Sequence, residues 1–101
     1  MRTLVLIAAA PPQVAVTDAM SCAEAALARG DSTYLYLYDE GVLLADSVAV
    51  QSLANRGAHV YACFESSRRR RVEIRSERVL LSGLVSLAGL IEGCDRLEAF
   101  T

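Results

Sequence analysis

The chain has 101 residues, of which 53% are hydrophobic, and carries a formal net charge of −2, with ten basic residues that are all arginine. This length predicts one domain, residues 1–101, and the slightly negative charge excludes a polycation that binds nucleic acid through bulk charge. Such a high apolar content in a small domain predicts that another subunit covers part of its surface, in a homo-oligomer or a hetero-oligomer.

The cysteine pattern and the apolar runs indicate the compartment. Cys22, Cys63 and Cys94 are widely spaced and form no C-x-x-C pair, which favours a reducing compartment over a disulfide scaffold. Residues 4–10 are apolar but too few for a good secretory leader, and their removal would delete the best candidate for a central strand. No run is long enough to span a bilayer. We therefore expect a cytoplasmic protein with no membrane partner.

The first third of the chain predicts a strand followed by a helix. Residues 3–9 form a continuous apolar run, typical of a strand buried on both faces of a parallel sheet. Pro11-Pro12 ends this strand. A helix is predicted to begin at an N-cap on Thr17 and to end before a C′ glycine at Gly30.

A tyrosine-rich strand is predicted next, over residues 33–38. Strand periodicity places Tyr34, Tyr36 and Tyr38 on one face. That face fits two settings equally well: a helix covers it, or a second subunit does. Asp39-Glu40-Gly41 follows as a turn at the carboxyl end of this strand.

The remainder of the chain continues the alternation of helices and strands. The expected elements are a helix capped by Asp46 or Ser47 and running to about Arg56, a strand at 58–63, a short strand around 79–81, a helix capped by Ser82 and ended by Gly93, and a strand at 96–100. In the last helix, Leu84, Leu87, Ala88 and Ile91 share one face. Alternating elements predict an α/β fold with three α/β/α layers and a mostly parallel sheet of about five strands.

Cys63 is the candidate functional residue, because it closes the strand at 58–63 and precedes Ser66, Ser67 and four arginines. Ligands and catalytic groups collect at the carboxyl ends of strands in open α/β sheets. If a helix begins at the serines, its N-terminus and nearby cations favour a thiolate. A buried, inert cysteine is the alternative, about equally favoured by the sequence. For Cys22 and Cys94 we expect a structural role.

The sequence contains no common nucleotide-binding or metal-binding motif. The loop after the first strand has no glycine, so neither a dinucleotide-binding fingerprint nor a P-loop is present. His59 is the only histidine, and no cluster suits a metal ion. The run Arg68–Arg71 covers every side of a helical turn, so only one or two of its arginines can point at Cys63. We expect neither a metal nor an organic cofactor.

Three stretches carry a resemblance to the DsrE/TusD-like (DsrE/DsrF-like) proteins of intracellular sulfur relay. They are the aromatic strand with its acidic-Gly-Val turn (36–42), the strand that ends at Cys63 and is followed by small residues and arginines, and the closing segments at 82–88 and 94–100. In order and spacing they span most of the chain.

The resemblance implies a three-layer α/β fold and a cysteine that accepts sulfane sulfur as a persulfide. Carried across, the acceptor is Cys63, and Asp39, Glu40 and Gly41 border its pocket, while Ser66, Ser67 and Arg68 follow as pocket or docking residues. It also implies protein donors and acceptors of sulfur, and assembly with related subunits. The alternative is a non-catalytic structural or small-ligand-binding subunit of such an oligomer. A third hypothesis is a pocket for a small anion at Ser66, Ser67 and the arginines.

Overall fold

One parallel sheet organises the chain in this computed structural model, which describes residues 1–11 and 13–101. Within those residues the sheet has five strands in the order β4-β3-β2-β1-β5, and every neighbouring pair is parallel. The strands are β1 (Arg2–Ile7), β2 (Ser32–Leu37), β3 (His59–Cys63), β4 (Val79–Ser82) and β5 (Arg96–Phe100). The helices are α1 (Val14–Ala28), α2 (Val48–Asn55), α3 (Phe64–Arg69), α4 (Leu84–Gly93) and a 3₁₀ helix, η1 (Asp39–Leu44).

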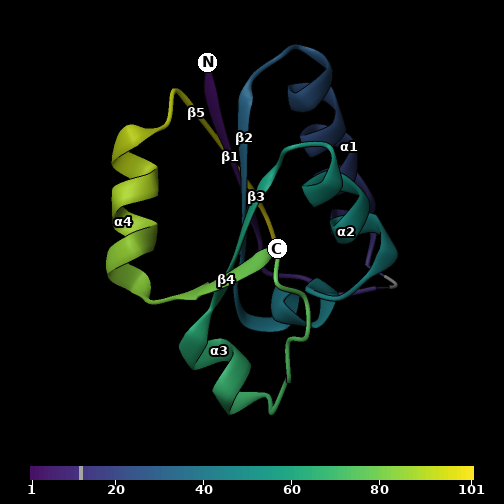
Figure 1. Cartoon of the computed structure of the whole chain (residues 1–101), viewed down its shortest axis with the longest axis vertical. Helices are drawn as coiled ribbons and strands as arrows, with labels where there is room; N and C mark the ends of the chain where they lie inside the picture. Colours follow the sequence, from purple (N-terminus) through teal and green to yellow (C-terminus); the bar gives the residue numbers. More distant parts are fainter. Residues whose placement is uncertain (12) are drawn as a thin grey trace.

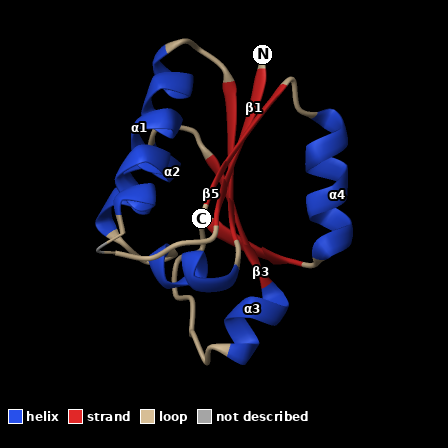
Figure 2. Cartoon of the chain, turned by 180° about the vertical axis from the view of Figure 1, so that it is seen from behind, coloured by secondary structure: helices blue, strands red, loops and turns tan. Residues whose placement is uncertain are grey.

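Helices cover both faces of the sheet, as Figures 1 and 2 show. Helices α1 and α2 lie on one face and α4 lies on the other, while α3 extends from the carboxyl end of β3. The expected α/β fold, with three layers and a parallel sheet of five strands, is therefore confirmed.

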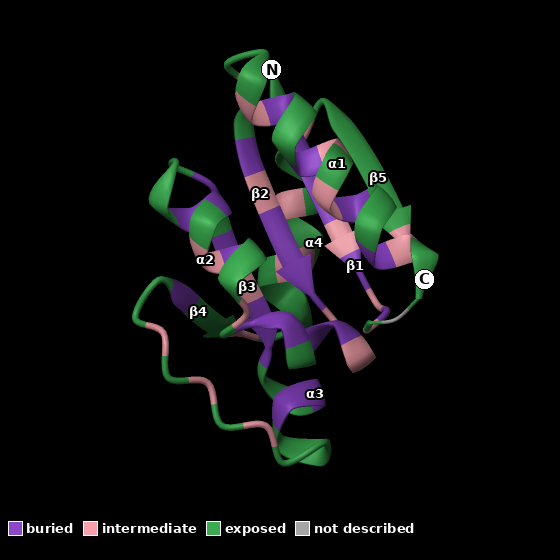
Figure 3. Cartoon of the chain, turned by 90° about the vertical axis from the view of Figure 1, so that its right-hand side faces the viewer, coloured by how far each residue is buried: buried purple, intermediate pink, exposed green. Residues whose placement is uncertain are grey.

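The larger part of the core lies between the sheet and helices α1 and α2. Because side chains alternate along a strand, Val5, Ile7, Leu35, Leu37 and Val60 point to this side, where all are buried. Small alanines on α1 let that helix approach the sheet closely. Figure 3 shows the central strands largely buried, whereas the connection from α3 to β4 is partly or fully exposed.

The second face carries a smaller core, which contains the tyrosines. Leu4, Tyr36 and Cys63 form its buried cluster, and the partly buried side chains packed against it are Leu6, Tyr34, Tyr38, Tyr61, Leu87, Leu90 and Cys94. The prediction that three tyrosines share one face is confirmed. Helix α4 is the element that packs on that face.

Helix α1 begins earlier than the sequence predicts. Its first residue is Val14 and its N-cap is Gln13, so the N-cap at Thr17 is wrong. Starting at Val14 places Val16 on the buried side of the helix, and that burial outweighs a side-chain cap worth about 1 kcal/mol. The predicted stop at Gly30 is confirmed: its φ is 83°, and the amides of Gly30 and Asp31 bond the carbonyls of Leu27 and Ala26 in a Schellman motif.

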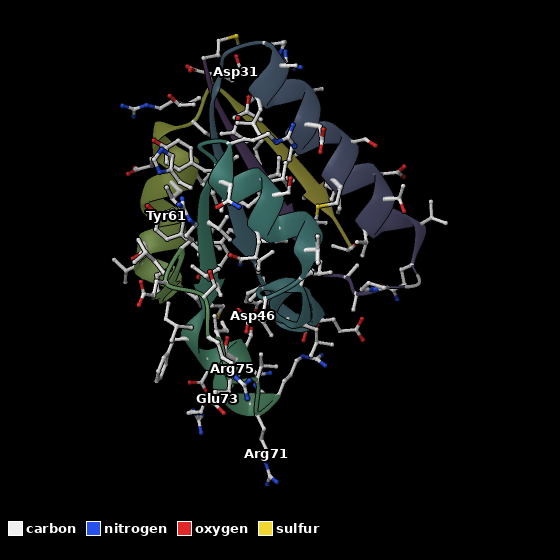
Figure 4. All side chains as sticks on the ribbon, turned by 45° about the vertical axis from the view of Figure 1, so that its right-hand side comes forward. Asp31, Asp46, Tyr61, Arg71, Glu73 and Arg75 are labelled. Carbon is white, nitrogen blue, oxygen red and sulfur yellow. The ribbon has the colours of Figure 1, made fainter. Side chains whose placement is uncertain are left out.

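Ser47 rather than Asp46 caps α2. The Ser47 hydroxyl accepts a hydrogen bond from the Val50 amide at 3.2 Å. The carboxylate of Asp46 instead accepts the backbone amides of Arg75 and Ser76, each at 2.9 Å, and Figure 4 shows Asp46 facing that segment. Asp46 thereby fastens the connection between α3 and β4 to the body of the protein.

Helix α4 differs from the prediction at its start and on its face. Ser82 is the last residue of β4, and Gly83 is the N-cap, so the cap at Ser82 is wrong. The predicted apolar face is the packed face only at Leu87: Leu84 and Ile91 are 59% and 41% exposed, and Ala88 is exposed as well. No residue of α4 is buried. No helix among the described residues has the length and apolar character needed to cross a membrane.

Candidate functional site

Cys63 lies where the strand β3 passes directly into helix α3. It is the last residue of β3 and also the N-cap residue of α3, so the helix starts one residue after the cysteine rather than at the serines. The β3 register places Cys63 on the α4 face of the sheet, beside Ser82 of β4. Its side chain is buried, with the residue 2% exposed.

Two serines of α3 form hydrogen bonds with Cys63, one with its sulfur and one with its backbone carbonyl. The Ser66 amide donates to the Cys63 sulfur at 3.4 Å, and the Ser67 hydroxyl donates to the Cys63 carbonyl oxygen at 2.9 Å. Both serines are buried. They were expected near Cys63 from the sequence, and the structure places them in direct contact with it.

The loop after β2 contacts the turn between β3 and α3. This contact is expected, because neighbouring parallel strands end at the same edge of the sheet. The Asp39 amide donates to the Ser66 hydroxyl oxygen at 3.0 Å. Ser66 therefore accepts a bond from the backbone of one loop and keeps its own proton free for another acceptor. Asp39 has a φ of 51°, a left-handed conformation that costs energy for a residue other than glycine. The Ser66 bond and an ion pair with Arg70, whose Nε lies 3.1 Å from the carboxylate, hold it there.

Gly41 is required by a close approach rather than by a ligand. A Cβ at this position would overlap the carbonyl oxygen of Ile7, so only glycine fits where η1 crosses the end of β1. Glu40 is partly exposed beside it. The predicted turn at 39–41 is thus the first part of η1, which packs across the carboxyl end of the sheet.

Tyr36 reaches the same place from β2. Its hydroxyl is 3.3 Å from the carbonyl oxygens of both Ser82 and Gly83, on the far side of β3. Since β3 lies between β2 and β4, the Tyr36 side chain crosses β3 in the layer that holds Cys63. Sequence reasoning missed Tyr36 and Ser82 as site residues, because only the strand order brings them to the cysteine.

These contacts alter the ionisation of Cys63. Burial by itself raises the pKa of the thiol, but hydrogen bonds from Ser66, from the Glu65 backbone and from Tyr36 outweigh it, and the pKa lies below the ordinary value. Burial raises the pKa of Tyr36, the Ser82 side chain opposes that rise, and the neighbouring Cys63 adds to it. Tyr36 therefore stays protonated as a donor while Cys63 loses its proton more readily.

The arginines do not take the place that the sequence suggested. Arg68 pairs with Glu65 on the exposed side of α3, where that bond lowers the pKa of the Glu65 carboxyl. Arg70 pairs with Asp39, and Figure 4 shows Arg71 extending away from the rest of the chain. Hydrogen-bond donors, not cations, therefore lower the pKa of Cys63.

The other two cysteines lie elsewhere. Cys22 of α1 packs against the larger core, and burial raises the pKa of its thiol. Cys94 follows α4 and donates to the Ile91 carbonyl at 3.2 Å. No group of three histidines, cysteines or carboxylates suited to a metal ion is found in the described part of the chain.

Helix α4 and strand β4 leave apolar side chains uncovered. The large exposed ones on the Cys63 side are Leu80 of β4 and Leu84, Val85 and Ile91 of α4, whereas Leu81, which pairs with Ala62, lies on the opposite face of β4. By contrast, each of the two helices on the opposite face exposes one such residue, Val14 on α1 and Val48 on α2. The face that holds Cys63 is therefore the less completely covered side of the molecule.

Comparison with known proteins identifies the fold. The structure matches the YchN protein of E. coli with a TM-score of 0.81 at 17% sequence identity, over 99% of this chain and 100% of that one. It also matches BT1422 of Bacteroides thetaiotaomicron, a conserved protein of unknown function, with a TM-score of 0.69 at 14% identity, over 97% of this chain and 94% of that one. No protein-family model and no curated protein sequence matches the chain.

At these identities the two structures establish a shared fold and no more. The shared fold extends over nearly the whole of this chain and of each neighbour. Its chemistry has to be inferred from its own residues.

Proposed function

We propose that this protein is a sulfur-relay carrier that accepts sulfane sulfur as a persulfide on Cys63 and passes it to an acceptor. The observation that carries the proposal is the position of Cys63 at the end of a parallel strand, with hydrogen bonds from Ser66 that lower the pKa of its thiol. The resemblance of three stretches to the DsrE/TusD-like family points to the same residue.

The transfer is a thiol exchange. The Cys63 thiolate attacks the outer sulfur of a donor persulfide, R–S–S⁻; a new sulfur–sulfur bond forms, the donor bond breaks, and the donor leaves as R–S⁻. An acceptor thiolate then attacks the outer sulfur of Cys63–S–S⁻ and restores the Cys63 thiolate. Each step conserves atoms and electrons, and neither requires a metal or an organic cofactor. The partners are a sulfur-donor and a sulfur-acceptor protein of the cytoplasm.

Cys63 is only 2% exposed, so a sulfur donor can reach it only after the residues that bury it move aside. Helix α4, which packs on that face, has no buried residue of its own. Displacing α4 therefore exposes less apolar surface than displacing α1 or α2, and α4 is the element that we expect to yield to a partner.

The test is intact-mass spectrometry after incubation with a low-molecular-weight persulfide donor. All three cysteines are free, so the informative protein is the double variant Cys22→Ala, Cys94→Ala, which keeps only Cys63. We expect this variant to gain the mass of one sulfur atom and to lose it to an added thiol acceptor. If Cys63→Ser takes up sulfur as well as wild type, the carrier hypothesis is wrong.

A second candidate function is favoured by the burial of Cys63 together with the exposed apolar side chains of α4 and β4. In this hypothesis the chain is a non-catalytic subunit that associates with copies of itself through that face. It predicts a stable oligomer in analytical ultracentrifugation and no uptake of sulfur. A monomer at micromolar concentration contradicts it.

A further inference from the structure

The hydroxyl of Ser82 is an unexplained feature beside Cys63. Its oxygen is buried and makes no hydrogen bond of good geometry, the one side-chain nitrogen or oxygen in that condition among residues 1–11 and 13–101, although it lies close enough to the Tyr36 hydroxyl to oppose the rise that burial causes in the pKa of that group. A buried hydroxyl without a partner costs about as much as a lost hydrogen bond. Such a group in a folded protein calls for an explanation, and a ligand that is absent from the structure is one.

Strand register places this hydroxyl next to the sulfur. Ser82 is the parallel partner of Cys63, so the two side chains leave the same face of the sheet from strands about 4.8 Å apart. Tyr36 passes over β3 to bring its hydroxyl to the carbonyl of the same Ser82. Three elements, β2, β3 and β4, thus bring one sulfur and two hydroxyls together in a layer shielded from water.

The bonding of Tyr36 leaves it free to change partner. Its single proton is shared between two carbonyl oxygens, each at 3.3 Å, which is long for a bond between oxygen atoms. An anionic sulfur is a stronger acceptor than either carbonyl, because hydrogen bonds to ionised groups are about twice as strong as neutral ones. The Tyr36 proton therefore turns to Cys63 once the thiol has ionised.

We propose that the hydroxyls of Tyr36 and Ser82, with the Ser66 amide, form a binding pocket for anionic sulfur, which holds first the Cys63 thiolate and then the outer sulfur of its persulfide. The second part rests on the proposed sulfur-carrier function; the first does not. Ser66 and Tyr36 bind the thiolate, and the unpartnered Ser82 hydroxyl donates to the terminal sulfur when Cys63–S–S⁻ forms. Tyr36 and Ser82 are positioning residues: they stabilise charge on sulfur and form no covalent bond.

The lowered pKa of Cys63 supports this arrangement, since a hydrogen bond from Tyr36 contributes to it. The pocket also explains how a buried sulfur carries a charge that neither Arg68, paired with Glu65, nor Arg70, paired with Asp39, is placed to offset. Several hydrogen-bond donors take the place of a counter-ion.

Two measurements in the Cys63-only background (Cys22→Ala, Cys94→Ala) test the proposal. The first is the pH midpoint at which the S–H stretching band of Cys63 disappears from the Raman spectrum, which requires no access to the thiol. Tyr36→Phe keeps the ring and removes only the hydroxyl, and we expect it to raise the midpoint by roughly one pH unit. Tyr34→Phe, on the same strand and face, serves as the matched control and leaves the midpoint unchanged.

The second measurement is the half-life of the persulfide loaded onto Cys63. We expect Ser82→Ala to shorten it by roughly tenfold and Ser82→Thr, which keeps the hydroxyl, to restore it. Ser86→Ala, on the exposed side of α4, is the control for a serine substitution outside the pocket.

The outcomes separate this pocket from the proposed function. If sulfur is loaded but Tyr36→Phe leaves the midpoint unchanged and Ser82→Ala leaves the half-life unchanged, the pocket is wrong and the carrier function stands. If Tyr36→Phe raises the midpoint but wild type takes up no sulfur, the thiolate pocket stands and both the carrier function and the role of Ser82 in holding the outer sulfur are wrong. If Tyr36→Phe leaves the midpoint unchanged and wild type takes up no sulfur, both proposals are wrong.

Discussion

The two faces of the sheet are built differently. Among the residues that the structure describes, the face beneath α1 and α2 holds eighteen buried residues in one cluster, whereas the face beneath α4 holds three, Leu4, Tyr36 and Cys63. The buried cluster of the first face is aliphatic, with Phe100 packed at its edge, whereas all four tyrosines and the candidate cysteine belong to the second face. Hydrophobic stabilisation is therefore concentrated on the α1/α2 face. The α4 face has polar groups, partly buried side chains and a helix with no buried residue.

This division has a physical logic. Hydrophobic burial of about 25 cal/mol per Å² on the α1/α2 side stabilises the fold, so the α4 side tolerates groups that cost stability, including the unpartnered Ser82 hydroxyl. Local opening of a protein draws on its less stable parts. The proposed sulfur transfer needs such an opening, and we expect it on the face where Cys63 lies.

The largest expected effect compares one leucine on each face. Leu35 is fully buried in the α1/α2 cluster, and Leu35→Ala should lower the free energy of unfolding by about 2–5 kcal/mol. Leu87, which is partly exposed on α4, should cost less than about 1.5 kcal/mol when changed to alanine, because water already reaches part of it and the cavity is smaller. Urea unfolding of the two variants beside wild type gives both values. Equal losses would mean that the two faces contribute equally to stability.

Sequence patterns predicted the first face better than the second. The continuous apolar run of β1, the Gly30 stop and the Ser47 cap each have a local cause, and the structure contains all three. The start of α1 was missed because burial of Val16 outweighs a capping preference. On the other face, the amphipathic pattern of α4 predicted an inward position for Leu84 and Ile91, yet both are exposed, since a helix with apolar residues all round does not show which side meets the sheet.

The sequence predicted the part of the candidate site that is formed by residues at the ends of strands. It did not predict the part that forms only because of the order of strands in the sheet. Cys63 and Asp39 follow neighbouring parallel strands, so their meeting at one edge could be expected. The approach of Tyr36 to Ser82 could not, because the two are 46 residues apart in sequence and meet only because β3 lies between β2 and β4. Whether the predicted residues act together in sulfur transfer stays a prediction.

A smaller effect concerns the pH dependence of stability on the tyrosine-containing face. Because the pKa of Cys63 is lower in the folded protein than in the unfolded chain, the native state binds fewer protons between those two values, and stability rises with pH across that window. The gain is fully present above the ordinary thiol pKa and is lost as pH falls through the folded one. Ser66→Ala keeps the amide bond to the sulfur but removes the hydroxyl, whose hydrogen bond also lowers the pKa of Cys63, so we expect a smaller rise.

The contribution of Cys63 ionisation to stability is measured by urea unfolding of wild type and Ser66→Ala, at one pH below the pKa of the folded thiol and one above the ordinary thiol pKa. The lost bond from Asp39 to Ser66 lowers stability by about 1 kcal/mol at every pH, and only the difference between pH values reports on Cys63. Arg68→Ala is the matched control, since Arg68 pairs with Glu65 at the surface. A rise with pH that is reduced as much by Arg68→Ala as by Ser66→Ala would mean that the arginines, not the serine, stabilise the thiolate.

The smallest expected change in the free energy of unfolding, and the most direct test of association, comes from substituting two valines that are almost equally exposed. Val85 of α4 is 89% exposed and Val48 of α2 is 86% exposed, on opposite faces of the molecule. A glutamate at either position should change the free energy of unfolding by no more than about 0.5 kcal/mol. If the α4 face associates with another copy of this chain, Val85→Glu places a charge in the apolar contact and shifts sedimentation toward the monomer, while Val48→Glu leaves it as in wild type. Dissociation by Val48→Glu alone would place the contact on the α1/α2 side, and the weakly packed face would then serve only for access to Cys63.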